Sequence, residues 1–124
     1  GAAVAVPARP VLSLQADGSA MYTISALWTQ ARESLDITTI VLNNGAYQIL
    51  RWELANVGVA EPHTRGRRVT DLLDLGNPDL DFVKIAEGMG VPARRVSTAE
   101  ELAAALREAF SEPGPHLIEA MLRA

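Results

Sequence analysis

Apolar residues gather in short, strand-sized runs that are separated by stretches with helical spacing. Four runs are predicted to be strands: Val11–Ala16, Ile37–Leu42, Val91–Val96 and Leu117–Leu122. We interpret the first two as runs without apolar–polar alternation, which is typical of strands that helices cover on both faces. The stretch between them has helical spacing, so the three elements predict a parallel, right-handed βαβ unit.

Helix-spaced apolar residues predict four helices, over about residues 20–35, 47–54, 78–88 and 98–110. Capping signals precede three of them: Asp17 or Ser19 before the first, Asn77–Pro78 before the third, and a capping box of Ser97 and Glu100 before the last. The resulting order, β-α-β-α-α-β-α-β, predicts a single α/β domain. Its core is an open parallel sheet with helices on both faces.

Composition and charge narrow the class of protein. The 124 residues are 48% hydrophobic and 21% charged, which corresponds to one globular domain and excludes disorder and coiled coil. No apolar run approaches the ~18 residues of a membrane span, so we expect no membrane partner. A formal net charge of −4 argues against nucleic-acid binding. The chain has no cysteine, which excludes disulfides and thiolate metal sites and fits a cytoplasmic location.

The chain begins with Gly1 rather than with methionine, and its first residues lack the basic lead of a secretory signal. We therefore interpret residues 1–124 as a piece of a longer, multidomain protein. A piece of this kind can hold half of a functional site.

Two polar clusters follow the first two strands directly. Asp17-Gly18-Ser19 ends the first strand, and Asn43-Asn44-Gly45 ends the second. Taken alone, each is also the sequence of an ordinary turn or helix cap. In open parallel sheets, however, ligands bind beyond the carboxyl ends of the strands, and neighbouring strands lie about 5 Å apart. If the two strands are neighbours, Asp17 and Asn44 can reach one small ion.

The ligands available to such an ion are all oxygen atoms. They are the Asp17 carboxylate, the Asn44 amide oxygen and a backbone carbonyl near Ala46. Oxygen ligands favour Mg²⁺ or Ca²⁺ over zinc, and Mg²⁺ commonly completes its shell with water and phosphate. A helix beginning near Ser19 would offer N–H groups to a phosphate, and Gly18 would permit close approach. The sequence therefore predicts Mg²⁺ that bridges the protein and a diphosphate.

The paired clusters resemble the thiamine-diphosphate signature, in which Gly-Asp-Gly is followed, after a spacer in the mid-twenties, by Asn-Asn. Here 24 residues (19–42) separate Asp17-Gly18 from Asn43-Asn44, and Ala16 replaces the first glycine of the signature. Other segments resemble the acetolactate synthase and decarboxylase branch of this family: Asn44–Tyr47, Leu50–Trp52, Asp81–Ala86 and Pro113–Glu119. The resemblance covers nearly the whole chain.

This resemblance implies the thiamine-diphosphate-binding fold, in the C-terminal domain of an enzyme that acts on a 2-keto acid. The site residues that it implies are Asp17, Asn44 and the Ala46 carbonyl for Mg²⁺, Gly18 and Ser19 for the diphosphate, Tyr47 beside the cofactor loop, and Leu50 and Glu53 in the substrate pocket. For Tyr47 and Glu53, core packing and solvent exposure are the respective alternatives. The family's activating glutamate comes from another domain of a neighbouring subunit. We therefore expect no catalytic residue here, an inactive fragment, and a homodimer or homotetramer with the site at the subunit interface.

Several functions remain open. The first is an acetolactate synthase large subunit, which decarboxylates pyruvate and joins it to a second keto acid. A benzoylformate-type decarboxylase is the second, although Glu53 stands near a position where such enzymes carry an aromatic residue. A non-catalytic assembly or regulatory domain is the third. A generic nucleotide-binding domain is disfavoured, because only Gly18 follows the first strand in place of a glycine-rich loop. A basic cluster further along the chain is typical of a solvated loop; it consists of His63, Arg65, Arg67 and Arg68.

Overall fold

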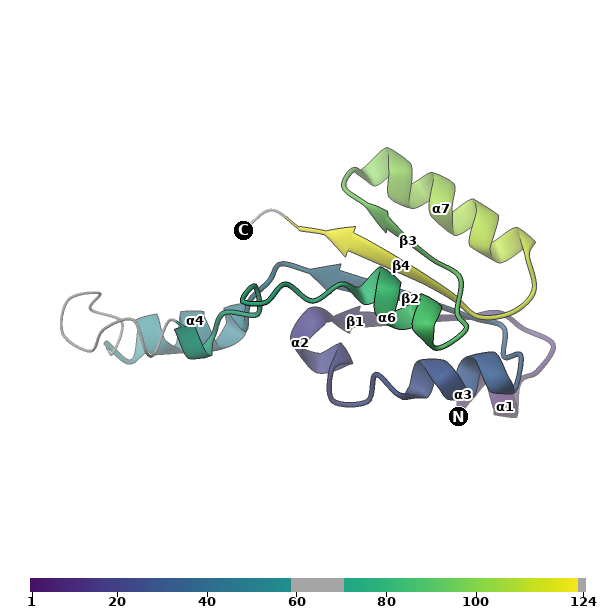
Figure 1. Ribbon diagram of the computed structural model, residues 1–124, viewed down its shortest axis with the longest axis horizontal. Coiled ribbons are helices and arrows are strands. Elements are labelled where there is room, and N and C mark those ends of the chain that lie inside the picture. Colours follow the sequence, from purple (N-terminus) through teal and green to yellow (C-terminus); the bar gives the residue numbers. More distant parts are fainter. Residues whose placement is uncertain (59–70, 123–124) are drawn as a thin grey trace.

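The computed structural model describes residues 1–58 and 71–122. Within them, four strands form one parallel sheet of order β1-β2-β4-β3 (Figure 1). The strands are β1 (Val11–Ala16), β2 (Ile37–Asn43), β3 (Ala93–Val96) and β4 (His116–Met121). This confirms the predicted α/β class and all four predicted strands. The segment that contains His63 and the three nearby arginines lies outside the described residues.

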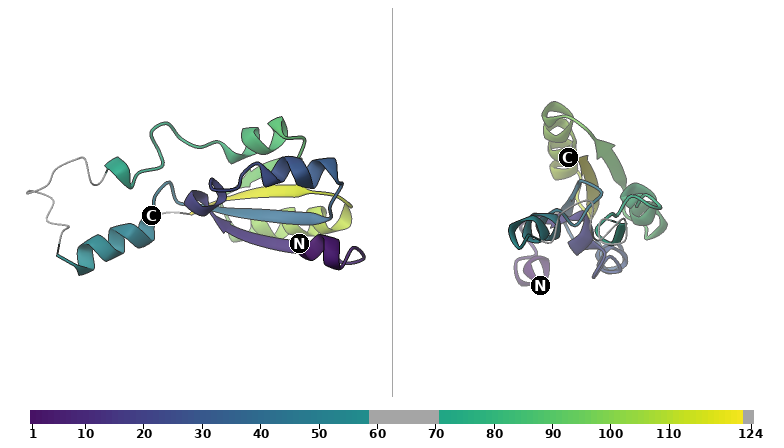
Figure 2. Two further views of the ribbon diagram at one scale, coloured as in Figure 1. Left: turned by 90° about the horizontal axis from the view of Figure 1, so that it is seen from below. Right: turned by 90° about the vertical axis from the view of Figure 1, so that its left-hand side faces the viewer.

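Helices lie on both faces of the sheet (Figures 1 and 2). They are α1 (Ala2–Ala5), α2 (Asp17–Ala20), α3 (Ala26–Arg32), α4 (Gln48–Asn56), α6 (Phe82–Gly88) and α7 (Ala99–Ser111). On one face, α3 and α6 pack over Val41 and Leu117, and Phe82 of α6 is fully buried there. On the other face, α7 packs over Ile40 and Ile118. No described helix is both long enough and apolar enough to cross a membrane.

The helix predicted over residues 20–35 is wrong as a single element. The chain instead forms one turn of helix, α2, and then a second helix, α3, with turns over residues 21–25 between them. Backbone hydrogen bonds between residues three apart, from the N–H of Thr23 to Ala20 and of Ala26 to Thr23, form these turns. Threonine and serine have lower helix propensity than alanine, which is consistent with a break there. The two proposed caps are also wrong. Asp17 lies inside the first turn, and the Ser19 hydroxyl donates a hydrogen bond to the Ala16 carbonyl, at 3.0 Å.

Two other helix starts differ from the prediction. Residues 77–78 form a turn, and α6 begins later, at Phe82, where the Asp81 carboxylate accepts a hydrogen bond from the Lys84 N–H at 3.1 Å. The capping box of α7 consists of Thr98 and Glu101, one residue beyond the predicted pair. The extended backbone of Thr98 (φ −128°, ψ 160°) is the conformation that an N-cap requires.

Strand β1 lies at the edge of the sheet, which contradicts the prediction that helices cover both of its faces. Its side chains alternate between half-buried and exposed, and Leu14 is 62% exposed. Leu14 is paired in register with Ile40, so both project from the same face. Helix α7 packs on that face against β2, β4 and β3, whereas Leu12 and Leu14 of β1 stay exposed there. Residues 12–16 in fact alternate between apolar and polar (Leu-Ser-Leu-Gln-Ala), so the interpretation of β1 as a run without alternation is wrong, and its two leucines lie on the exposed face.

Candidate functional site

The carboxyl ends of β1 and β2 lie side by side, as the predicted site requires. The strands are parallel neighbours, and Ala16 is paired in register with Leu42. The residue that follows β1, Asp17, is 3% exposed, and its Oδ2 accepts hydrogen bonds from the backbone N–H groups of Asn44 (3.0 Å) and Gly45 (2.8 Å). The structure thus brings the two polar clusters into direct contact.

The Asp17 carboxylate retains capacity for a cation. Its Oδ1 accepts a hydrogen bond from the Gly18 N–H at 2.7 Å, so backbone amides supply three donors in all. An ionised carboxylate has about four acceptor positions, so one is left for a further ligand. Within residues 1–58 and 71–122, no basic side chain forms an ion pair with Asp17. Since a buried charge is costly without a partner, this position suits a metal ion.

The loop after β2 holds the other predicted ligands in place. Asn44 Oδ1 accepts a hydrogen bond from the Ala46 N–H at 3.0 Å. Gly45 has a positive φ of +68°, a backbone conformation that glycine adopts without strain. Its carbonyl accepts a hydrogen bond from the Leu75 N–H at 2.8 Å, which ties the loop to a distant segment of the chain. The Ala46 carbonyl accepts one from the Gln48 N–H at 2.9 Å and has a second lone pair available.

Gly18 is needed for a different reason from the one that the sequence indicated. A Cβ atom added at Gly18 would overlap the ring of Tyr47, at Cε1 and Cδ1. Tyr47 therefore packs directly against the turn after β1, and its place beside a bound cofactor remains a prediction. The helix that begins there, α2, has only four residues, so it cannot supply the strong helix dipole expected near Ser19.

In the described structure, Leu50 and Glu53 do not lie at this site. Both lie on α4, which extends away from the sheet (Figures 1 and 2), and both are exposed. Apolar neighbours on the same helix, Ile49 and Trp52, are exposed as well, at 62% and 60%. The substrate pocket predicted from these residues remains a prediction.

A buried polar network behind the loop was missed in the sequence. Glu119 of β4 is fully buried, and its two oxygens accept hydrogen bonds from Asn43 Nδ2 (2.7 Å) and Arg95 Nε (2.9 Å). Arg95 also lies 3.4 Å from Asp81, which forms a 2.8 Å ion pair with Lys84. The sequence signal that could have revealed it is a single glutamate inside the apolar run of the last strand.

This network shifts the pKa of its exposed members in opposite directions. The hydrogen bond to Glu119 raises the pKa of Arg95 above its ordinary value. The hydrogen bonds from the Lys84 side chain and backbone lower the pKa of the Asp81 carboxyl. Both groups are therefore charged across the neutral pH range, and the buried carboxylate of Glu119 has a permanent cation beside it.

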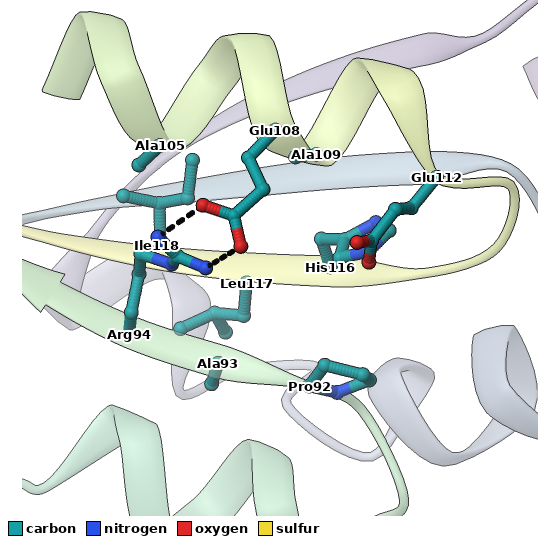
Figure 3. Close-up of a pocket in the computed structure, with 10 residues that line it drawn as sticks. All are labelled: Pro92, Ala93, Arg94, Ala105, Glu108, Ala109, Glu112, His116, Leu117 and Ile118. Carbon is teal, nitrogen blue, oxygen red and sulfur yellow. Dashed lines mark hydrogen bonds and ion pairs between the residues drawn. The ribbon is translucent and has the colours of Figure 1, made fainter.

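A hollow of about 80 Å³, separate from the carboxyl ends of β1 and β2, lies between α7 and the strands β3 and β4 (Figure 3). There Arg94 and Glu108 form two side-chain hydrogen bonds, the longer of which is 2.6 Å. His116 lies 3.7 Å from Glu112, and its buried Nδ1 has no hydrogen-bond partner in the described part of the chain. The acidic and basic groups here are paired with one another, so this hollow offers a metal or phosphate little.

No three His, Cys, Asp or Glu side chains gather into a metal site among residues 1–58 and 71–122. The edge of β1 and β2 instead offers one carboxylate, one amide oxygen and one backbone carbonyl. Such a sparse set of ligands suits a cation that shares its shell with water or a phosphate-bearing ligand.

A comparison with protein families matches residues 1–120 to the model described as "Thiamine pyrophosphate enzyme, C-terminal TPP binding domain". The chain belongs to this family. The match extends over nearly the whole chain and contains both polar clusters. The family supports thiamine diphosphate as the cofactor of this domain, as the sequence resemblance implied.

Two relatives connect the domain to two enzyme types. The chain is 66% identical over 122 residues to a protein of Mycobacterium tuberculosis named "Putative acetolactate synthase large subunit IlvX", covering 98% of this chain and 23% of that protein. It is 43% identical over 119 residues to benzoylformate decarboxylase of Pseudomonas aeruginosa, covering 96% and 21%. The chain thus spans about a fifth of the length of these relatives.

A solved structure with the same fold is the thiamine diphosphate-dependent 4-hydroxybenzoylformate decarboxylase of Rhodococcus jostii RHA1. It superposes with a TM-score of 0.84 at 38% sequence identity, covering 98% of this chain and 21% of that chain. The chain therefore has the fold of the C-terminal thiamine-pyrophosphate-binding domain, and it is related to the corresponding parts of acetolactate synthases and benzoylformate decarboxylases.

Proposed function

We propose that this domain binds the diphosphate of thiamine diphosphate through Mg²⁺, as part of an enzyme that acts on 2-keto acids. The observation that carries the proposal is the buried Asp17 carboxylate, held by backbone amides of the Asn44 loop at the ends of two adjacent parallel strands. Asp17, the Asn44 amide oxygen and the Ala46 carbonyl are the proposed Mg²⁺ ligands. Gly18 and Ser19 are the proposed neighbours of the diphosphate.

The contribution of these residues is to bind and to orient. The backbone amides hold the Asp17 carboxylate in one orientation, and the sheet fixes the spacing of the two clusters. Tyr47 packs on Gly18 and limits the space above the turn. Thiamine diphosphate, when bound, supplies the electron sink that decarboxylation of a 2-keto acid requires.

The activating glutamate and the rest of the substrate pocket are proposed to come from parts of the enzyme beyond residues 1–124. In that case residues 1–124 alone are inactive. We further propose a homodimer or homotetramer in which the site lies between subunits. The exposed apolar side chains of α4, Ile49 and Trp52, are suited to such an interface.

The proposed reaction is that of an acetolactate synthase, because the relative with that name is 66% identical to this chain. The second candidate is a decarboxylase of benzoylformate or a related aryl keto acid. It is favoured by the 43% identity to a benzoylformate decarboxylase. Turnover of the full-length protein on pyruvate and on benzoylformate separates the two, since one yields acetolactate and the other an aldehyde. Turnover of neither substrate would favour a non-catalytic domain.

The cofactor site is tested by calorimetric titration of the full-length protein with thiamine diphosphate, with and without MgCl₂. We expect Asp17→Asn and Asn44→Ala each to weaken Mg²⁺-dependent binding by roughly 100-fold or more, since even outer-shell substitutions cost 10–100-fold. The matched control is Asp36→Asn, which removes one aspartate charge just before β2, at the opposite end of that strand. If the Asp17 and Asn44 variants bind as tightly as this control, the site is assigned wrongly.

A further inference from the structure

Glu119 is a fully buried carboxylate that the proposed cofactor chemistry does not use. It projects from β4 toward the loop after β2 and accepts hydrogen bonds from Asn43 Nδ2 at 2.7 Å and from Arg95 Nε at 2.9 Å. A buried ion pair contributes weakly to stability, because desolvation offsets most of the Coulombic attraction. The position of Glu119 behind the proposed metal loop therefore calls for another explanation.

The orientation of the Asn43 amide depends on Glu119. An asparagine amide donates at one end and accepts at the other, and the two ends are nearly the same shape. A carboxylate can only accept, so Glu119 selects the orientation in which Nδ2 faces it. Asn43 Oδ1 then faces the loop, where it accepts a hydrogen bond from the Gly45 N–H at 3.0 Å.

The same N–H group connects Asn43 to the proposed metal ligands. The Gly45 N–H also donates to Asp17 Oδ2 at 2.8 Å, so two oxygens share this single hydrogen. Were the Asn43 amide reversed, its NH₂ group would face the Gly45 N–H, and two donors would repel. The loop carrying Asn44 would then move away from Asp17.

We propose that Glu119 is a positioning residue for the metal loop, acting through the orientation of the Asn43 amide. This proposal rests on the proposed Mg²⁺ site at Asp17 and Asn44. Arg95 supplies the counter-charge beside Glu119, with Nε 2.9 Å from its Oε2. The chain of contacts runs from Arg95 to Glu119, to Asn43, to Gly45 and to Asp17.

The structure contains a matched pair that lacks this connection. Arg94 and Arg95 are neighbours on β3, and each is bonded to a glutamate, Glu108 of α7 and Glu119 of β4 respectively. The Arg94–Glu108 pair lies in the hollow of Figure 3, on the face that α7 covers, and makes no described contact with the loop. Removing Glu108 therefore breaks an arginine–glutamate pair of the same type without touching Asn43.

Exchanging the two side chains provides the sharpest test. Asn43→Asp alone places two carboxylates next to each other. Glu119→Gln alone leaves only one acceptor oxygen for two donors, Asn43 and Arg95. The double variant restores the pattern with the roles reversed, because the amide introduced by Glu119→Gln can donate to the carboxylate introduced by Asn43→Asp while its carbonyl accepts from Arg95. The freed guanidinium of Arg95 in Glu119→Gln stays hydrated, since its side chain is 47% exposed and borders a hollow of about 290 Å³.

The measurement is the Mg²⁺ concentration that half-saturates binding of thiamine diphosphate to the full-length protein, by calorimetry, at a temperature where circular dichroism shows every variant folded. We expect Asn43→Asp to raise it about 10-fold or more and Glu119→Gln about 3- to 10-fold, as for other outer-shell groups. The double variant should return to within about 3-fold of wild type, and Glu108→Gln should match wild type.

Three results would overturn the proposal. The first is a half-saturating Mg²⁺ concentration for Glu119→Gln equal to that of wild type. The second is a double variant that needs as much Mg²⁺ as Asn43→Asp, and the third is an equal rise in this concentration for Glu108→Gln. If Asn43→Asp does not fold, the comparison of Glu119→Gln with Glu108→Gln still decides. Failure of the metal site itself is recognised separately, because Asp17→Asn would then bind cofactor as tightly as wild type.

Discussion

The carboxyl edge of β1 and β2 and the hollow beneath α7 both contain acidic side chains, but the partners of these acids differ. At the edge, the Asp17 carboxylate is buried and bonded to three backbone N–H groups. Beneath α7, Glu108 is bonded to Arg94, and Glu112 lies near His116. Amide donors hold a carboxylate in place and leave its charge available, whereas an arginine neutralises it.

This difference explains why the two regions have different uses. An acid held by the backbone can still attract a cation, while an acid already paired with arginine mainly connects two elements. The Arg94–Glu108 pair joins β3 to α7 in this way. Hollows in a small domain are therefore better compared by the unused charge of their lining groups than by their volume. The predictions below test whether the two regions are as separate as their contacts indicate.

The largest effect on unfolding free energy is expected at the turn that Tyr47 covers. A methyl group added by Gly18→Ala overlaps the Tyr47 ring, so the turn or the ring must move. Overpacking of this kind costs about 1–3 kcal/mol in unfolding free energy. Because Gly18 follows Asp17, Mg²⁺-dependent cofactor binding should weaken as well, by roughly 10-fold.

The control for this substitution is Gly88→Ala in α6. A Cβ atom at Gly88 meets nothing within 4 Å, and its φ is not positive, so alanine should be neutral or slightly stabilising there. Thermal unfolding and calorimetric titration of the full-length protein measure both quantities. Equal behaviour of the two variants would show that Tyr47 yields without cost and does not shape the site.

The sequence predicted β1 and β2 well because each is a short run that ends in a clear turn signal, Asp17-Gly18 and Asn43-Asn44-Gly45 respectively. It also placed Asp17 and Asn44 at one edge, since parallel neighbouring strands end together. It did not predict the edge position of β1, because burial on one face depends on where α7 lies. The contacts of α7 with the other strands are tertiary facts that no local pattern contains.

The missed part of the site is the network around Glu119. Its members come from β2, β3, β4 and the start of α6, so no spacing along the chain connects them. A lone glutamate in an apolar strand can face solvent at an edge or lie buried against a cation. Only the pairing of β3 with β4, which puts Arg95 opposite Glu119, selects the second.

An intermediate effect on unfolding free energy is expected at the start of α7, the helix that lines the hollow. The Glu101 N–H donates a hydrogen bond to Thr98 Oγ1 at 3.2 Å, and Thr98→Ala removes this cap. We expect a loss of about 1 kcal/mol in unfolding free energy. Cofactor affinity should be unchanged, because no side-chain hydrogen bond or ion pair of α7 among the described residues reaches the loop after β2.

The companion variant is Ser97→Ala. The sequence pattern favoured Ser97 as the cap, whereas in the structure only its backbone N–H bonds to Glu101, at 2.7 Å. Chemical denaturation should therefore rank Ser97→Ala close to wild type and Thr98→Ala below it. The reverse ranking would place the helix start one residue earlier and contradict the structure.

The smallest effect is the acid sensitivity of the Arg94–Glu108 pair. The hydrogen bonds from Arg94 lower the pKa of the Glu108 carboxyl below its ordinary value. A lowered carboxyl pKa contributes stability that is complete above the unfolded-state value, about 4.3 for glutamate. That contribution is lost as the pH falls further, through the folded-state pKa, because protonation then breaks the pair.

Thermal midpoints of the full-length protein, recorded from about pH 6 down to pH 3, measure this sensitivity. Glu108→Gln cannot be protonated in this range, so its midpoint should fall less steeply than that of wild type below about pH 4.5. Glu100→Gln on the same helix is the control, since Glu100 forms no ion pair within the described residues. Because the pair is exposed, the difference in slope should be small.

Cofactor affinity at neutral pH should be the same in both variants, since neither glutamate is connected to Asp17. A change in that affinity for Glu108→Gln alone would mean that the hollow and the carboxyl edge are coupled through the sheet.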